Sequence, residues 1–467
     1  MGGFFATISC KDCVSDLYYG TDYHSHLGTR RGGMAVYNGK GFKRSIHSLE
    51  NSYFRTKFES ELNEFNGKSG IGVISDFESQ PIIVQSHLGD FAVVTVGKIF
   101  NLEELTRRAL RRHHHFSEIS PEGTNPSELV ATLIAEEESF EKGIEHVYDM
   151  VKGSCSMLVL TRKGIYGARD KLGRTPVILG KKEGAYAFSS ETTAFSNLDF
   201  TVERDLGPGE IVFITADGYE QRKKPYPNMQ ICAFLWVYYG YPSSSYEGIN
   251  VEECRYRCGA ALARNDNVKA DFVSGIPDSG IAHAIGYSNQ KQIPYKRAYI
   301  KYTPTWPRSF MPQNQATRDL VAKMKLIPVK ALIEGKKIVF CDDSIVRGTQ
   351  FKENVAILFE YGAAEIHVRP ACPTLIYPCD FLNFSRSRST LDLAGRKAIK
   401  DIEGAEDKHL EEFATPGTER YYAMIENIRK RIGVTTLQYQ KLEDLLEAIG
   451  LPKERVCTHC WEGKSFF

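Results

Sequence analysis

Two adjacent carboxylates, Asp342 and Asp343, mark the stretch whose residue types and spacing best suit chemistry. They end an apolar run, and a loop of small and hydroxyl residues follows from Ser344 to Thr349, before a helix-like segment at 351–361. In open α/β sheets, ligands bind where strands end, and a loop that opens a helix aims backbone N–H groups at an anion. The acids suit ribose hydroxyls or a metal ion beside that anion. The sequence therefore predicts a site for a phosphorylated sugar.

The bare pattern also occurs where acids merely cap a helix after a strand. The whole string is more specific, because Asp342-Asp343-Ser344-Ile345-Val346-Arg347-Gly348-Thr349 resembles the PRPP-binding motif of type I phosphoribosyltransferases. It is most similar to the motif of the glutamine PRPP amidotransferase family. The resemblance implies that Asp342 and Asp343 position the ribose hydroxyls, with Mg²⁺ nearby, and that residues 344–349 hold the 5′-phosphate.

A second strand-to-helix turn occurs earlier in the chain, at Ile276-Pro277-Asp278-Ser279-Gly280. Such a turn is more often ordinary than functional, but beside residues 342–349 it resembles the family's pyrophosphate loop. The resemblance implies that Asp278, Ser279 and Gly280 hold the pyrophosphate end of PRPP. The family's reaction displaces Mg-bound pyrophosphate from the ribose C1 by ammonia, so that the metal and positioned donors stabilise the developing charge.

Residues 300–312 match the family segment that closes over PRPP, and Lys301 and Arg308 fit its usual pattern. The stretch 302–307 departs from that pattern, because two prolines stand where a supple segment with a glycine is expected. A stiffer segment would close less readily. Lys323 also matches and would face a phosphate, although a solvated helix face is an equally good interpretation.

At 467 residues the chain is long enough for two or three domains, each with its own core. A net charge of +1 and a pI near 7.5 give no electrostatic reason to expect a nucleic-acid or membrane partner. The sequence shows neither a secretory leader nor an apolar run that could span a bilayer. We therefore expect a cytoplasmic protein.

The chain changes character near residue 230. The first half is β-rich, with a helix predicted at 127–136 that Ser127 would cap, and residues 222–228, with their lysines and prolines, predict a linker. In the second half strands alternate with helices, which implies a mostly parallel sheet with helices on both faces. The strands expected there are 270–275, 296–301, 338–342 and 366–371.

The first half resembles the N-terminal-nucleophile glutaminase domain of the same family. Its surviving landmarks are 16–20, His26, Gly28, Gln80-Pro81, Gly97, Asn101-Leu102, Ser127-Glu128, 170–176, Ser190-Glu191 and 206–210. The resemblance covers nearly the whole chain and implies an α/β fold in two domains. We expect an Ntn-type αββα glutaminase-like domain at 1–228 and a type I phosphoribosyltransferase domain, with a parallel sheet and a helical tail, at 229–467.

The catalytic residues of that glutaminase are missing. The family exposes a cysteine directly after the initiator Met, whose own α-amine serves as base, but here the position holds Gly2. The expected substrate-binding Arg is absent from residues 73–79, Val96 replaces the oxyanion-hole Asn, and Pro126 replaces an Asp. One lost oxyanion donor raises a barrier by about 3 kcal/mol. We therefore expect no glutaminase activity.

Four of the eleven cysteines form a second candidate site. Cys457-Thr-His-Cys460 has the spacing of half a zinc site or a redox pair. Some members of the family carry a [4Fe-4S] cluster, and the resemblance implies that Cys232, Cys379, Cys457 and Cys460 are its ligands. Four thiolates suit zinc equally well, so that zinc remains an alternative.

Three functions are compatible with these residues. The first is an amidophosphoribosyltransferase-like enzyme that forms 5-phosphoribosylamine from PRPP with free ammonia or ammonia supplied by a partner. The second is a non-catalytic PRPP- or nucleotide-binding protein that regulates an active paralogue, and the third uses another amine. The resemblance also implies a purine nucleotide effector and a homo-oligomer.

Overall fold

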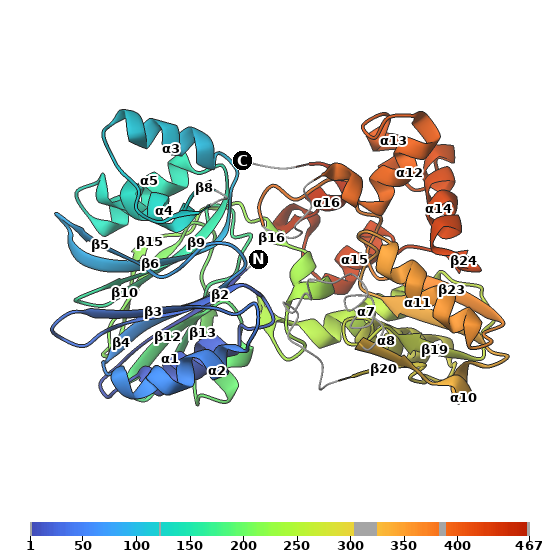
Figure 1. Cartoon of the computed structure of the whole chain (residues 1–467), viewed down its shortest axis with the longest axis horizontal. Helices are drawn as coiled ribbons and strands as arrows, with labels where there is room; N and C mark the ends of the chain where they lie inside the picture. Colours follow the sequence, from blue (N-terminus) through green and yellow to red (C-terminus); the bar gives the residue numbers. More distant parts are fainter. Residues whose placement is uncertain (1, 121–122, 303–324, 383–388, 465–467) are drawn as a thin grey trace.

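The computed structural model describes residues 2–120, 123–302, 325–382 and 389–464, and they form two halves that lie side by side (Figure 1). The first half contains two stacked sheets, and the second half contains a smaller parallel sheet with helices around it. The strands of the two halves do not mix, since every strand up to residue 223 pairs within the first half.

The first half is a sandwich of two antiparallel sheets. In one sheet the strand order is β13 (Thr201–Asp205), β11 (Ile178–Lys182), β12 (Ala185–Ser189), β1 (Gly3–Ser9), β4 (Ser69–Ser75), β2 (Arg31–Tyr37) and β3 (Phe42–Ser48). In the other it is β15 (Tyr219–Lys223), β14 (Ile211–Ile214), β10 (Ile165–Ala168), β9 (Gly153–Thr161), β6 (Gly89–Ile99) and β5 (Ile82–Ser86).

Helices cover both outer faces of this sandwich, which gives the αββα order expected from the resemblance (Figure 1). One face carries α1 (Val14–Asp22) and α2 (Phe54–Phe58), and the other carries α3 (Leu102–Arg111), α4 (Pro126–Ala135) and α5 (Phe140–Met150). Between the sheets lies an apolar core that includes Phe4, Val94, Leu158 and Phe188. Strands β1 and β9 are buried along nearly their whole length, as unbroken apolar runs predict.

The second half is built on four parallel strands in the order β19 (Phe272–Gly275), β22 (Lys337–Asp342), β23 (Glu365–Pro370) and β24 (Thr436–Leu437). Alternate side chains face opposite layers. Val273 and Val339 pack toward α7 (Val251–Arg264) and α8 (Ile281–Lys291), and Ile338 and Phe340 pack toward the opposite layer. That layer consists of α11 (Thr349–Glu360), α12 (Ala394–Glu403) and α14 (Glu419–Ile432).

Three local expectations need correction. Asn125, not Ser127, caps α4, because its side chain accepts from the Ser127 N–H and Pro126 occupies the first helical position. The linker starts later than residue 222, because Tyr219–Lys223 pair with β14 as β15. The strand expected at 296–301 shortens to β20 (Tyr299–Lys301), which pairs antiparallel with β21 (Leu326–Pro328) outside the parallel sheet.

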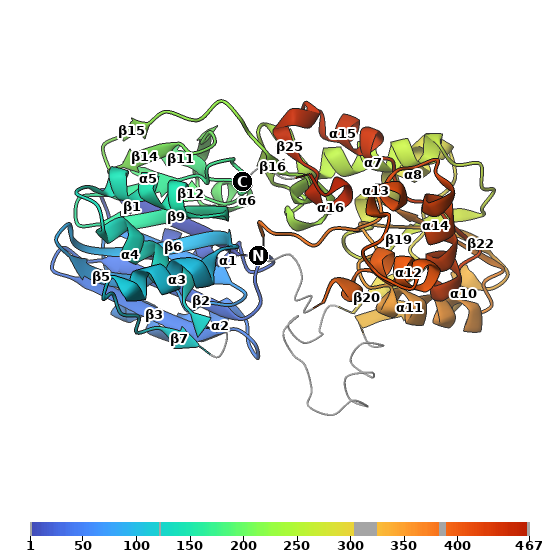
Figure 2. The same cartoon turned by 90° about the horizontal axis from the view of Figure 1, so that it is seen from above.

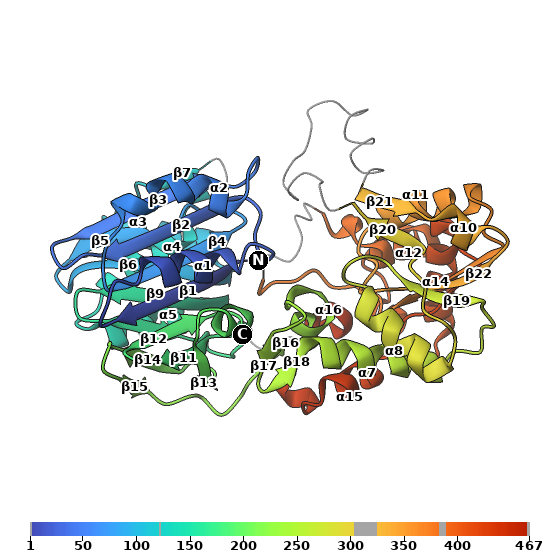
Figure 3. The same cartoon turned by 90° about the horizontal axis from the view of Figure 1, so that it is seen from below.

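A short parallel strand pair joins the beginning and the end of the second half, next to the first half (Figures 2 and 3). β16 (Ile231–Cys232) pairs with β25 (Val456–Cys457), so that Cys232 lies opposite Cys457. The Cys232 N–H also donates to the carbonyl of Arg174 in the first half, at 3.2 Å.

Buried charges also connect the two halves. The Arg169 side chain of the first half is fully buried, and its Nη1 lies 2.6 Å from Oε1 of Glu247 in the second half. Asp205 lies beside them, and its Oδ1 is shielded from solvent and accepts no hydrogen bond. Burial and the nearby charge of Glu247 raise the pKa of Asp205 to about 6, although Arg169 opposes the effect.

Candidate functional site

The two loops predicted to bind PRPP lie side by side at the carboxyl edge of the parallel sheet. Strands β19 and β22 are neighbours, so that residues 276–280, after β19, lie beside Asp342 and Asp343, at the end of β22. The Ile276 N–H donates to the Cys341 carbonyl oxygen at 3.0 Å, directly before the two carboxyl groups. The fold therefore brings together two loops that are more than sixty residues apart in the sequence.

A glycine permits this close approach. A Cβ added at Gly280 would lie 2.3 Å from the Cys341 carbonyl oxygen, and one added at Gly275 would lie 2.6 Å from the Gly280 carbonyl oxygen. These atoms are backbone and cannot rotate away. A side chain at Gly280 would therefore separate the two loops.

Local hydrogen bonds fix the acidic part of the loop. The Asp343 N–H donates to Asp342 Oδ1 at 2.9 Å, and the Ser344 hydroxyl donates to Asp343 Oδ1. Both carboxyl groups are buried, and Ile345 packs below them in the apolar core. Their positions are therefore fixed before any ligand binds.

The rest of the loop leads into α11. The Ala394 N–H, at the start of α12, donates to the Val346 carbonyl at 2.7 Å, and Arg347 Nη2 lies 3.6 Å from Asp392 Oδ2. Gly348 has φ +75°, a conformation that favours glycine, and α11 starts at the next residue, Thr349. This geometry aims the first N–H groups of α11 at the loop, as an anion site requires.

The ionised forms of Asp342 and Asp343 are disfavoured in this arrangement. Burial, and then repulsion from Asp343, raises the pKa of Asp342 well above its usual range. Burial also raises the pKa of Asp343, although hydrogen bonds from Ser279 and Ser344 and the charge of Arg255 oppose the effect. A cation or hydroxyl donors at this position would stabilise the ionised forms.

The remaining PRPP candidates fall into two groups. Lys301 forms an ion pair with Asp278, and both side chains are largely exposed. The pair joins β20 to the turn at 276–280, and the roles of both residues in PRPP binding stay predictions. Arg308 and Lys323 lie outside the described residues.

The four candidate cysteines gather where β16 meets β25. Cys232 and Cys457 are paired in register, and Cys379 hydrogen-bonds to Cys460. The Cys460 carbonyl accepts from the N–H groups of residues 376 and 377 at 3.1 Å each, which brings the segment before Cys379 to the same place. The hydrogen bond with Cys460 lowers the pKa of Cys379 to about 7 despite burial, and burial raises the pKa of Cys232 and Cys457.

These thiols are neighbours but do not surround one point. Within residues 2–464 as described, no three His, Cys, Asp or Glu side chains are arranged to hold a single metal ion. All four thiols nevertheless influence one another electrostatically. A cluster in which each thiolate binds a different iron needs less convergence than one zinc ion bound by four sulfurs, so the donor set suits a cluster better.

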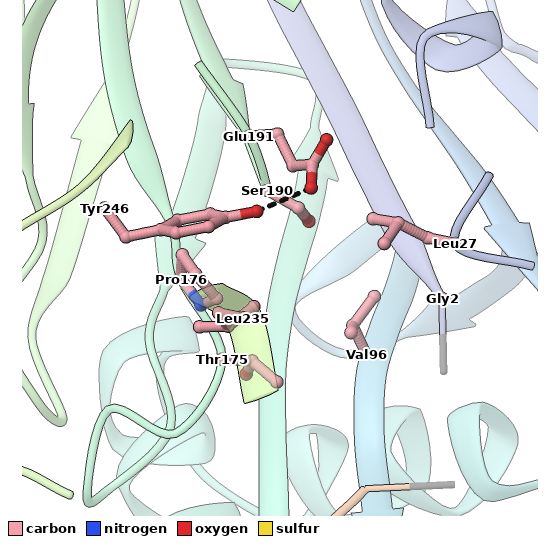
Figure 4. Close-up of a pocket in the computed structure, with 9 residues that line it drawn as sticks. All are labelled: Gly2, Leu27, Val96, Thr175, Pro176, Ser190, Glu191, Leu235 and Tyr246. Atoms are coloured by element: carbon pink, nitrogen blue, oxygen red, sulfur yellow. Dashed lines mark hydrogen bonds between the residues drawn. The ribbon is translucent and has the colours of Figure 1, made fainter. Parts of the chain in front are cut away.

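A small cavity lies where the glutaminase residues would be (Figure 4). Gly2 and Val96 line it, together with Leu235 and Tyr246 from the second half. Its volume is about 10 Å³, room for one water molecule. A Cβ added at Gly2 would lie 2.6 Å from a backbone carbonyl oxygen of β4.

Glu191 borders this cavity and is bonded to both halves. The Tyr246 hydroxyl donates to Glu191 Oε1 at 2.5 Å (Figure 4). His26 Nε2 lies 2.9 Å from Glu191 Oε2. Burial alone would raise the pKa of Glu191, but the charge of His26 and these hydrogen bonds hold it below its usual value. The carboxylate therefore has structural partners from both halves.

Sequence reasoning did not identify the residues that close the cavity. Leu235 belongs to the one-turn π-helical segment Leu235–Tyr239, and Tyr246 belongs to the short strand β17 (Ser245–Tyr246). The run of aromatic residues from Phe234 to Tyr239 was the available signal for a buried segment.

Fold and site define a class: a glutamine amidotransferase-type sandwich joined to a phosphoribosyltransferase-type sheet that carries the Asp342–Thr349 loop. A glutamine amidotransferase domain family matches residues 69–197. The amidophosphoribosyltransferase of Methanocaldococcus jannaschii is 32% identical over 99% of this chain and 97% of its own length. The corresponding Bacillus subtilis protein is 30% identical over 99% and 93%.

Solved structures are similar to this chain over nearly its whole length. The glutamine PRPP amidotransferase from B. subtilis, complexed with ADP and GMP, has a TM-score of 0.84 at 29% identity and covers 99% of this chain and 96% of its own. The chain belongs to the amidophosphoribosyltransferase family. Within the part that the structure describes, no helix combines the length and hydrophobicity needed to cross a bilayer.

Proposed function

We propose that this protein binds PRPP and Mg²⁺ and forms 5-phosphoribosylamine and pyrophosphate with ammonia that it does not make itself. The observation that supports the proposal is that residues 276–280 lie against the end of β22, where the Ile276 N–H donates to the Cys341 carbonyl at 3.0 Å. The two loops that we assign to pyrophosphate and to ribose phosphate are therefore adjacent. Such a pair of loops spans the two charged ends of one PRPP molecule.

Each part of the site has a distinct task. Asp342 and Asp343 accept hydrogen bonds from the ribose hydroxyls, and the N–H groups of residues 344–349 hold the 5′-phosphate. The Ser279 hydroxyl faces the pyrophosphate, whose charge increases as it leaves, and Lys301 adds a positive charge on that side. Mg²⁺, when bound beside the aspartates, neutralises part of that charge.

The loss of the glutaminase is supported by three independent observations. Gly2 has no nucleophilic side chain, and its surroundings leave no space for one. Val96 offers no side-chain donor to an oxyanion. The cavity at this place has a volume of about 10 Å³, room for one water molecule, and is far too small for a glutamine side chain. We propose that residues 1–228 act as an inactive domain, with the phosphoribosyltransferase domain at 229–467.

We also propose that Cys232, Cys379, Cys457 and Cys460 hold a [4Fe-4S] cluster rather than zinc. Their convergence from three segments onto the β16–β25 pair supports a structural group at this point. When bound, the cluster would tie the start of the second half to its end. It lies apart from the PRPP loops and takes no part in the transfer.

The test is pyrophosphate release from PRPP and Mg²⁺ by metal-loaded protein, with ammonium or with glutamine as the amine source. We expect release with ammonium and none with glutamine. Release with glutamine would contradict the proposed loss of the glutaminase. PRPP binding without release under either condition would instead favour a non-catalytic regulatory protein.

Asp343→Ala serves as the check on the site itself, and Asp217→Ala, at an exposed position of the first half, is its control. We expect Asp343→Ala to abolish PRPP binding in calorimetric titration. Unchanged affinity would refute the assignment of the loop.

A further inference from the structure

Two basic side chains of the first half reach the cysteine site of the second half. Arg174 lies in the loop between β10 and β11, and its guanidinium carbon is 3.6 Å from the centre of the Phe381 ring. The same side chain is buried, and its positive charge opposes the rise in the pKa of the nearby Cys457 thiol. Lys98, in β6, donates from Nζ to the Cys379 carbonyl at 3.0 Å.

The backbone strengthens the contact at Arg174. Its carbonyl accepts the Cys232 N–H at 3.2 Å, and its guanidinium stacks on Phe381, two residues after Cys379. This one residue therefore contacts the chain at or beside two of the four candidate ligands. Its Nη1 also donates to the Gly153 carbonyl at 3.3 Å, which fixes the guanidinium relative to the first-half sheet. The orientation of Arg174 toward the thiols is therefore set by its own half.

The charge at this place needs explanation. A buried guanidinium is stable only with compensating negative charge or well-placed acceptors. Four thiolates around an oxidised iron–sulfur core leave a net negative charge, which two cations offset. Hydrogen bonds to ligating sulfurs and nearby charge also set the reduction potential of such a cluster.

We propose that Arg174 and Lys98 are positioning residues for the metal group of the cysteine site. Arg174 holds the backbone of Cys232 and stacks on Phe381, Lys98 holds the backbone of Cys379, and loading of the site thereby fixes the two halves against each other. This inference rests on the proposed four-cysteine cluster. It implies that the metal group determines not only the local fold but also how firmly the inactive domain is attached.

The test compares full-length wild type with Arg174→Gln, Arg174→Lys and Lys98→Gln, each reconstituted anaerobically with ferrous iron and sulfide. Lys171→Gln is the matched control, because Lys171 lies in the same loop but is exposed. The measurements are iron per chain, the midpoint potential by spectroscopic redox titration, and the rate of iron release to a chelator. Hydrogen exchange of residues 229–235 reports the contact between the halves.

We expect Arg174→Gln to lower the midpoint potential and to release iron about tenfold faster, as loss of an outer-sphere partner typically does. Arg174→Lys should restore part of the potential, because the charge remains. Loading should protect residues 229–235 in wild type and the Lys171 control. That protection should decrease in Arg174→Gln and Lys98→Gln.

If Arg174→Gln binds iron and keeps the wild-type potential, release rate and protection, this inference is overturned, but the proposed cluster is not. Wild type that binds no iron would overturn the proposed cluster, and this inference with it, while ammonia-dependent pyrophosphate release would still test the proposed transfer. If circular dichroism shows that Arg174→Gln does not fold, the same measurements on Arg174→Lys and Lys98→Gln test the inference. Wild-type behaviour in both would then refute the inference.

Discussion

Replacing Asp205 with asparagine is expected to remove a pH-dependent loss of stability at the junction of the two halves. The Asp205 Oδ1 is shielded from solvent without a hydrogen bond, although the residue as a whole is only partly buried. Glu247 of the second half repels its charged form, and Arg169 attracts it. Asparagine has nearly the same shape and carries no charge.

The magnitude follows from the pKa of the carboxyl group. Its value is 3.8 in an ordinary environment and about 6 in the folded protein. The folded state therefore binds more protons between these values, and its stability falls as the pH rises through this window. The difference is worth up to about 3 kcal/mol. The amide of Asp205→Asn does not titrate, so the free energy of unfolding of the variant, relative to wild type, should rise by about this amount between pH 4 and pH 7.

Urea unfolding followed by circular dichroism at pH 4, 5, 6 and 7 measures the free energy of unfolding of Asp205→Asn and of wild type. The other titrating groups are the same in both proteins, so their contributions cancel in the difference. Asp217→Asn is the control, because Asp217 is exposed in the same half, and its difference from wild type should not change with pH. A pH-independent difference for Asp205→Asn would show that the carboxyl group is solvated in the folded protein and would refute the reasoning.

Three further outcomes are expected. Gly280→Ala should weaken PRPP binding about tenfold or more, because its Cβ would lie 2.3 Å from the Cys341 carbonyl oxygen. Calorimetry with PRPP and Mg²⁺ measures the affinity, and an unchanged value would contradict this prediction. Asp266→Asn should lower the free energy of unfolding by about 3–5 kcal/mol, because Arg369 is buried against this carboxylate at 2.6 Å; an unshifted urea midpoint would be evidence against it. Gly2→Cys should release no glutamate from glutamine, because the cavity has room for one water; any glutamate above the wild-type background would show that the pocket opens.

The strand, loop and helix around Asp342 and Asp343 could be predicted from the sequence because their signals are local. The acids, the hydroxyl residues and Gly348 follow one another in the chain, and the strand and helix around them are short and regular. The contact of residues 276–280 with the end of β22 could not be derived from composition or periodicity. It depends on β19 and β22 being neighbours, which is a property of the sheet order.

The cavity at Gly2 shows the same limit more strongly. Gly2 and Val96, which the resemblance singles out, are visible as single residues, but the side chains that close the cavity come from Leu235 and Tyr246 in the other half. Similarly, the Asn125 cap was missed because Ser127 is also a common cap, and only the position of Pro126 decides between them.

The pairing of β16 with β25 has a consequence for the order of events during synthesis. The first half completes both its sheets by residue 223, so that it can fold while the ribosome is still translating the rest. The second half cannot do so, because β16 is made first and its partner β25 near the end. Until Trp461 is made, the cluster that contains Phe234 and Trp236 is incomplete, and Phe234 has no Trp461 ring to stack on. The nascent chain therefore carries a folded first half and an incomplete second half for most of the second half's synthesis, and chaperones that protect exposed apolar surface would act there.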